Sequence, residues 1–312
     1  MNMDFCILVS THDKYIDLAK LTVELIHERW RNHPEIFVCG VSQPFSGVTE
    51  TLLLVNDAMD WIGITETAIN ELIKKGFRKC YFILEDHPPL QICNDSHLNF
   101  TLPALMDKLG AAYIGLYGWD QNTLSSGTVL GTEFYRLQDQ DTSFLWKYSL
   151  HPALWNLEAF KAILGALPLI EDEISSRSAW AFERRSGALQ STAPVEWKGR
   201  SYRVFGLGML NSRFRLIRSL SRQLMFLTIN FMSMIIKWVF GNDKLERFVS
   251  FFLPEALFFD GPYPLFWSGV MQKGILNKNF EKFLVLHRRN KELSNYHAAL
   301  KKNDKNTPLG FR

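Results

Sequence analysis

Three side chains that can bind a metal follow one another directly after an apolar run. Glu85, Asp86 and His87 come immediately after residues 80–84, and Pro88 stops the strand from continuing. A short apolar run that ends in charge predicts a buried parallel strand, and open α/β sheets bind ligands beyond the carboxyl ends of such strands. We therefore expect Asp86 and His87 to hold a divalent metal that binds a diphosphate. The alternative is a solvated loop start or a helix cap.

Other polar side chains stand at the ends of further predicted elements. Ser10 and Thr11 follow an apolar run at residues 5–9, where their hydroxyls could contact a nucleotide or cap the next helix. Asp60 precedes a predicted helix at residues 61–75 and could accept a hydrogen bond from a base or a ribose. As a plain N-cap it would look the same, so both roles stay open for each residue.

The elements that must position these side chains alternate along the first part of the chain. Apolar spacing predicts helices at 15–30, 61–75 and 98–109, and strands at 5–9, 36–39, 52–55, 80–84 and 113–117. This order predicts an α/β fold with a mostly parallel sheet covered by helices on both faces. Then the order changes: we expect antiparallel strands at 128–137 and 144–150, and helices at 156–167 and 174–185.

Bulk composition excludes some classes of protein. The chain has 312 residues with a net charge of only +3, which gives no support for nucleic-acid binding. Its four cysteines form no C-x-x-C pair, so a zinc knuckle is not expected, and buried cysteines favour a reducing compartment. The first residues carry no signal-peptide pattern, so we expect a cytoplasmic protein.

Four stretches resemble, in this order, the bacterial glycosyltransferases of the GT-A fold, within the broad family-2-like group. They are residues 9–13 (VSTHD), 60–61 (DW), 82–87 (FILEDH), and 148–155 (YSLHPALW) with 179–183 (AWAFE). The resemblance spans about residues 4 to 185. One departure stands out, because His87 occupies the place of an aspartate in the family's D-x-D-type metal motif.

The resemblance implies roles for individual residues. It makes Glu183 the candidate catalytic base, with Asp120 as the fallback, and implies Mn²⁺ or Mg²⁺ as cofactor. The alternative for Glu183 is an ion pair with a basic residue one helical turn away. The implied contacts to the nucleotide-sugar donor are Ser10, Thr11, Asp60, Glu85, Asp86 and His287. The implied contacts to the acceptor are Trp119, Trp155 and Trp180, although core packing is the more common fate of tryptophan.

Residues 213–244 combine a cationic stripe with a broad apolar face. Arg215, Arg218 and Arg222 fall on one side when the segment is wound as a helix, and apolar side chains cover most of the rest. This pattern is typical of an interfacial helix lying among lipid headgroups, and a buried core helix is the alternative. We therefore expect peripheral association with the inner face of the cell membrane.

The sequence thus predicts three regions: a GT-A-like domain at 1–205, an amphipathic basic helix region at 206–250, and a C-terminal region at 251–312. The implied function is inverting transfer of a sugar from a nucleotide-diphosphate sugar to a glycan or lipid-linked acceptor, in cell-surface polysaccharide or lipopolysaccharide assembly. Two alternatives remain: a catalytically inactive glycan- or partner-binding relative, and another nucleotide-binding α/β transferase. No phosphate-loop G-x-x-x-x-G-K-[ST] pattern is present to support the latter.

Overall fold

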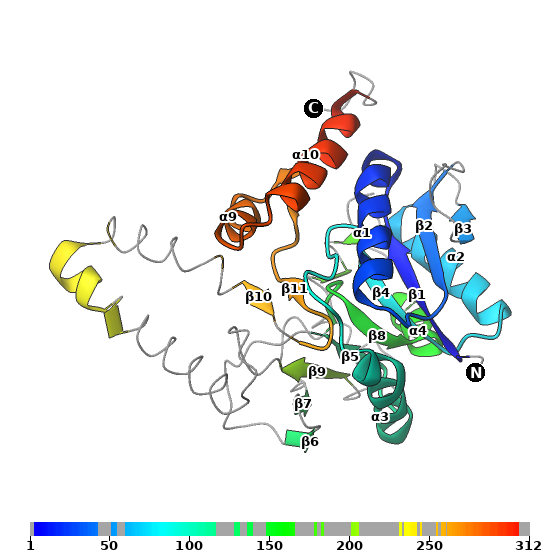
Figure 1. Cartoon of the computed structure of the whole chain (residues 1–312). Helices are drawn as coiled ribbons and strands as arrows, with labels where there is room; N and C mark the ends of the chain where they lie inside the picture. The colour runs from blue at the N-terminus through cyan, green and yellow to red at the C-terminus, as the bar shows by residue number, and fades with distance from the viewer. Residues whose placement is uncertain are drawn as a thin grey trace, which may run out of the picture.

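A mixed sheet with helices on both faces forms the centre of the molecule (Figure 1). This computed structural model describes residues 3–42, 51–54, 60–116, 128–131, 136–139, 148–165, 178–179, 182–183, 201–205, 231–232, 234–241, 244, 254, 257–259 and 261–305. Within these residues the sheet has nine strands in the order β3-β2-β1-β4-β8-β5-β9-β7-β6. The strand order places β4 near the middle of the sheet, between a parallel half and a mixed half.

The parallel half confirms the predicted alternation of strands and helices. Its strands are β1 (Phe5–Ser10), β2 (Ile36–Val41), β3 (Thr51–Leu54) and β4 (Lys79–Leu84). Every neighbouring pair among them runs parallel. All six residues of β1 are buried, as expected for a strand covered on both faces.

The mixed half is built around β8 (Ala153–Asn156), which lies antiparallel between β4 and β5 (Tyr113–Gly115). Beyond β5, β9 (Ser201–Phe205) runs parallel to it, and β7 (Arg136–Asp139) and β6 (Thr128–Gly131) add antiparallel pairs. The predicted antiparallel addition is therefore confirmed. The prediction of a strand reaching residue 150 is wrong, because residues 148–150 form a bend and the strand begins only at Ala153. The apolar side chains in this bend are buried without joining a strand ladder.

The helices cover both faces of the sheet, as the sequence predicts. The 3₁₀ turn η1 (Asp13–Tyr15) leads into α1 (Ile16–Arg29), and the π-helical turn η2 (His97–Thr101) leads into α3 (Leu102–Leu109). Both α1 and α3 pack on one face, and α2 (Trp61–Lys74) and α4 (Leu157–Gly165) pack on the other. Strand β4 supplies both cores, since Tyr81 and Ile83 point to the first face and Cys80 and Phe82 to the second.

The C-terminal segment returns to the parallel half of the sheet. It contains the short strand pairs β10 (Phe258–Phe259) with β11 (Leu265–Phe266), and β12 (Met271–Gln272) with β13 (Ile275–Leu276), followed by α9 (Lys278–Leu286) and α10 (Asn290–Lys305). Leu21 of α1 belongs to one apolar cluster with Phe283 of α9 and Tyr296 of α10. An ion pair of 2.8 Å between Arg29 and Glu292 also fastens α10 to α1.

A short helical stretch from the predicted membrane-binding segment is described at residues 231–232 and 234–240. Its apolar side chains are largely exposed, with Trp238 at 89% and Met234 at 70%. No helix in the described part of the chain combines the length and apolar character that crossing a membrane requires.

Candidate functional site

The loop that follows β4 is held in place by backbone contacts with its neighbours. Strands β1 and β4 end side by side, with Ser10 paired to Leu84. The amide of Glu85 donates to the carbonyl of Ser10 at 3.1 Å, and the hydroxyl of Thr22 in α1 donates to the carbonyl of Glu85 at 2.5 Å. These contacts fix the path of Asp86 and His87 at the carboxyl end of the sheet, where the sequence predicts them.

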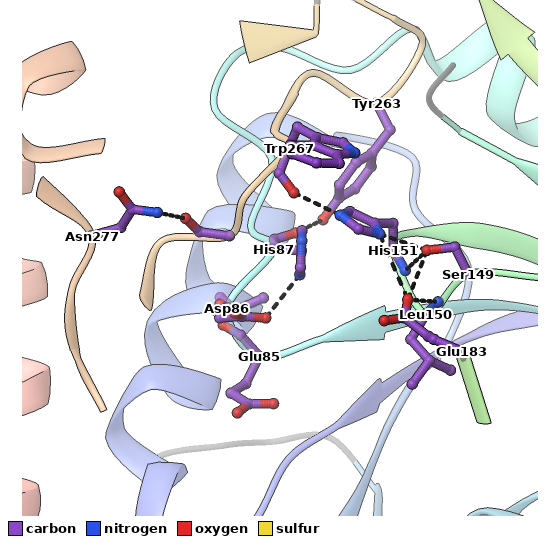
Figure 2. Close-up of polar contacts among 12 residues, drawn as sticks. Glu85, Asp86, His87, Ser149, Leu150, His151, Glu183, Tyr263, Trp267 and Asn277 are labelled. Atoms are coloured by element: carbon purple, nitrogen blue, oxygen red, sulfur yellow. Dashed lines mark hydrogen bonds and ion pairs between the residues drawn. The ribbon is translucent and has the colours of Figure 1, made fainter. Parts of the chain in front are cut away.

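Asp86 and His87 pair with each other. The Oδ1 atom of Asp86 lies 2.8 Å from Nδ1 of His87 (Figure 2). The backbone of both residues is held by residues 261–277, which we call the strap. The amide of Val270 donates to the carbonyl of Asp86 at 2.8 Å, and the hydroxyl of Tyr263 donates to the carbonyl of His87 at 2.9 Å. The strap therefore fixes the pair as well as covering it.

The strap approaches Asp86 most closely at Gly269. This glycine has a φ of +69°, and a Cβ atom placed on it would lie 2.5 Å from Oδ2 of Asp86. Any side chain here would collide with the carboxylate and would also strain the backbone. The strap is braced on its other side, where the Asn277 side chain donates to the hydroxyl of Ser268 at 2.9 Å.

A second polar cluster lies beside the first and contains Glu183. Its Oε1 atom accepts hydrogen bonds from the hydroxyl of Ser149 and from the amide of Leu150, both at 2.8 Å. The same hydroxyl oxygen lies 2.6 Å from Nδ1 of His151, which is 3.9 Å from Oε1 of Glu183 (Figure 2). The bend at residues 148–150 thus presents a hydroxyl and an amide to one carboxylate oxygen.

The two clusters meet at a pair of histidine rings. The ring centroids of His87 and His151 are 4.8 Å apart, and the His151 ring stacks on Trp267 of the strap at 5.8 Å. The Nε2 atom of His151 also lies 2.6 Å from the carbonyl oxygen of Trp267. Asp86, His87, His151 and Glu183 therefore form one continuous site under the strap (Figure 2).

The ionisation of the β4 loop follows from its surroundings. Burial raises the pKa of Glu85 to about 8, and the charge of Asp86 adds to this effect, so Glu85 is largely protonated at neutral pH. Burial by itself would lower the pKa of His87. The adjacent Asp86 carboxylate, together with the Trp267 backbone and the charge of Glu183, outweighs this effect, and the pKa of His87 lies above its ordinary value.

The described residues do not complete a ligand set for a divalent metal. Asp86 and His87 use Oδ1 and Nδ1 on each other, and Figure 2 shows the Glu85 carboxyl pointing away from both. The Nε2 atom of His87 is buried without a hydrogen-bond partner among the described residues. Those residues also contain no group of three or more histidine, cysteine, aspartate or glutamate side chains that could hold a metal. The described residues thus offer only part of a ligand set, and the metal expected from the sequence stays a prediction.

The remaining donor-side residues fall into different surroundings. Ser10 and Thr11 are buried at the end of β1, and neither is a helix cap: His12 caps η1 by accepting from the amide of Lys14, and Tyr15 is the N-cap residue of α1. Asp60 caps α2, with its Oδ1 atom 2.8 Å from the amide of Gly63. Asp60 is thus the N-cap of α2, which is one of the two roles that the sequence left open for it.

Trp155 and His287 lie apart from the polar clusters just described. Trp155 is fully buried in the core, where it stacks on Phe160 at 4.1 Å, so it has no surface for an acceptor. His287 ends α9 and contacts the ring of Phe283. Trp119, Asp120 and Trp180 lie outside the described residues.

Several residues of the site were not singled out from the sequence. Ser149 and His151 lie in residues 148–155, which the resemblance includes as a whole without giving either residue a role. The spacing Ser-x-His is a further signal that could have drawn attention to them. Gly269 lies in residues 266–276, which resemble the family's C-terminal loop that closes on the donor, whereas Tyr263 carries no such signal. Both are more than 170 residues away from Asp86 and His87 along the chain. Only folding brings them there, through backbone contacts that leave no side-chain pattern.

Comparison with known proteins finds solved structures that are only weakly similar to this chain. No protein-family model matches the chain, and no curated protein matches it. Among solved structures it is similar to a mannose-1-phosphate geranyltransferase from Thermus thermophilus, with a TM-score of 0.35 and 13% identity over 65% of this chain and 74% of that chain. It is also similar to S. aureus TarS 1–349, with a TM-score of 0.37 and 13% identity over 99% of this chain and 94% of that chain. At these values neither likeness assigns a function.

Proposed function

We propose that this protein is a GT-A-like glycosyltransferase that moves a sugar from a nucleotide-diphosphate sugar to a glycan or lipid-linked acceptor. The observation that carries the proposal is the single site under the strap, which joins Asp86 at the end of a parallel strand to the Glu183 carboxylate. Ligands of open α/β sheets bind at this edge. The motif resemblance along the first 185 residues points to the same class of enzyme.

In the proposed reaction Glu183 acts as the general base. The acceptor hydroxyl gives its proton to the Oε2 atom of Glu183 as its oxygen attacks the anomeric carbon, and the nucleoside diphosphate leaves from the opposite side. This single displacement inverts the anomeric centre. Ser149 and Leu150 orient the carboxylate by holding Oε1, so the direction in which Oε2 faces the acceptor is set before the substrate binds.

Asp86 serves the donor side as a hydrogen-bond acceptor. One of its oxygens is engaged by His87, and the other lies under Gly269, so the strap and the β4 loop hold the carboxylate in one orientation. A ribose or sugar hydroxyl is the partner that such a carboxylate binds without a metal.

The pathway proposed for this enzyme is the assembly of cell-surface polysaccharide or lipopolysaccharide. The exposed apolar side chains at residues 231–240 support a peripheral contact with the inner face of the cell membrane, where a lipid-linked acceptor would lie. A catalytically inactive relative that binds a glycan or a partner remains the second candidate, favoured by the histidine at position 87.

A panel of nucleoside diphosphates and their sugar conjugates tests the proposal. We expect one nucleotide to raise the melting temperature of the protein, and its sugar conjugate to be consumed when an acceptor-containing membrane extract is added. Binding without any consumption of the sugar nucleotide would favour the inactive relative. Absence of binding across the whole panel would contradict the glycosyltransferase and favour a protein that binds only a glycan or a partner.

A further inference from the structure

We infer that Glu183 and His151 share one proton through the hydroxyl of Ser149, that His151 holds this proton at rest, and that it keeps Glu183 in the carboxylate form that a base requires. The inference rests on the proposed function for the role of Glu183 as a base. The hydrogen bonds themselves can be examined without any assumption about activity.

Ser149 has too few protons to donate in both of its side-chain contacts. Its hydroxyl has one proton, yet the oxygen lies within hydrogen-bond distance of both Glu183 Oε1, at 2.8 Å, and His151 Nδ1, at 2.6 Å. One of these contacts must therefore use a proton supplied by Glu183 or by His151. The other ring nitrogen of His151 faces the carbonyl oxygen of Trp267 at 2.6 Å, and a carbonyl only accepts, so Nε2 carries a proton.

Two arrangements satisfy these contacts. In the first, Glu183 is protonated and donates to Ser149, which donates to a neutral His151. In the second, His151 is doubly protonated and donates to Ser149, which donates to the Glu183 carboxylate. The two differ only by the transfer of one proton along the three groups.

The amide of Leu150 selects the second arrangement. It donates to the same Oε1 atom at 2.8 Å, so this oxygen receives two hydrogen bonds when Ser149 also donates. A carboxylate accepts two such bonds well, whereas the hydroxyl oxygen of a protonated carboxyl is a weak acceptor. Among the described residues, Glu183 favours a proton on His151, a protonated His87 opposes it, and Asp86 offsets the charge of that His87.

Ser149, Glu183 and His151 differ in solvent exposure, and this difference indicates a different role for each. Ser149 is only 2% exposed, so it cannot serve as a nucleophile for a substrate and acts as the bridge. The side chains of Glu183 and His151 are 15% and 18% exposed, so both ends of the bridge can reach the substrate or solvent. His151 is accordingly a positioning residue that acts through Glu183.

The first test is spectroscopic and independent of activity. In protein labelled with ¹⁵N-histidine, both ring nitrogens of His151 should be protonated at pH 7, with the signal identified by its loss in His151→Asn. In Glu183→Gln the titration of His151 should move to lower pH by about one unit or more, the effect of removing an opposite charge at this range. A neutral His151 at pH 7, or a titration unchanged by Glu183→Gln, would overturn the inference.

The second test concerns the base. His151→Asn keeps a donor towards Ser149 but has no charge, so kcat should fall by up to about tenfold on the acid limb of the pH profile, the effect of a one-unit shift. The acid limb of its pH profile should move up by about one unit, while nucleoside-diphosphate binding is unchanged. His27→Asn, on the exposed side of α1, is the matched control and should leave the profile alone. An unshifted profile in His151→Asn overturns the role in catalysis, whereas failure of the unaltered protein to turn over any nucleotide sugar overturns the proposed function itself.

Discussion

Oδ1 of Asp86 lies 2.8 Å from Nδ1 of His87, the residue directly after it. This contact closes the two side chains on each other at the place where a metal motif is expected from the sequence. The strap holds both residues through their backbone carbonyls, so the two side chains are left to pair with each other. The contact bears on whether nucleotide binding needs a metal and on the packing of Gly269 against Asp86.

Binding of the nucleoside diphosphate is expected to be independent of divalent metal. Isothermal titration with EDTA and with Mn²⁺ should give dissociation constants within a few-fold of each other, because Asp86 Oδ1 and His87 Nδ1 engage each other and the described residues form no group of three or more metal ligands. Asp86→Asn should weaken binding of the sugar nucleotide, and Asp17→Asn in α1 is a control for the loss of one charge. A large gain in affinity with Mn²⁺ would instead mean that the pair opens to admit a metal.

Glu183→Gln is expected to separate donor binding from transfer. Glutamine can still accept hydrogen bonds from Ser149 and Leu150 but cannot take up the acceptor's proton. Transfer should fall by roughly two to four orders of magnitude, the range for loss of a general base, while nucleotide affinity persists. The exposed Glu158→Gln on α4 serves as the control. Joint loss of nucleotide affinity and folding would identify Glu183 as a structural glutamate.

Glu85 should make the protein less stable as pH rises. Its pKa is raised from 4.5 to about 8 by burial, so the folded state keeps a proton that the unfolded chain releases. The contribution of this group is fully present below about pH 4.5 and is lost as pH rises through 8. Relative to Glu85→Gln, the free energy of unfolding should therefore fall by roughly 1.4 kcal/mol per pH unit within that window. Urea unfolding at a series of pH values measures the difference, and parallel curves for the two proteins would refute it.

Gly269→Ala should loosen the strap, and Gly274→Ala provides an internal comparison. Both glycines have positive φ, at +69° and +80°, so both substitutions strain the backbone. Only the added Cβ at position 269 meets Asp86, at 2.5 Å, whereas at position 274 it makes an ordinary contact of 3.6 Å with Tyr15. The melting temperature and the sugar-nucleotide affinity should both fall further in Gly269→Ala. Equal effects in the two variants would show that the strap does not press on Asp86.

The apolar side chains at residues 231–240 should bind lipid. Replacing Trp238 and Phe240, which are 89% and 64% exposed, with serine should abolish flotation with anionic vesicles and leave the melting temperature unchanged. Replacing the arginines at 215, 218 and 222 with glutamine should weaken flotation mainly at low salt, because charge attraction is screened and apolar burial is not. A collapsed melting temperature in the serine variant would instead indicate a core helix.

The sequence by itself determined the parallel half of the fold and the position of the candidate site within it. Strands β1, β2 and β4 and helices α1 and α2 follow from local apolar periodicity, because each buries a face defined by its own residues. The run of apolar residues ending at Glu85 also placed Asp86 and His87 at a strand terminus. These inferences depend on neighbours within a few positions, and such information survives in a linear sequence.

Only the tertiary structure decided what those residues contact. Strand β8 inserts between β4 and β5 although it follows β5 in the chain, and this insertion places His151 beside His87. The strap reaches Asp86 from residue 270 through a backbone amide, which any residue type except proline could supply. Contacts of this kind depend on how distant segments pack, so no local pattern encodes them. The pairing of Asp86 with His87 and of Glu183 with Ser149 is therefore a property of the folded chain.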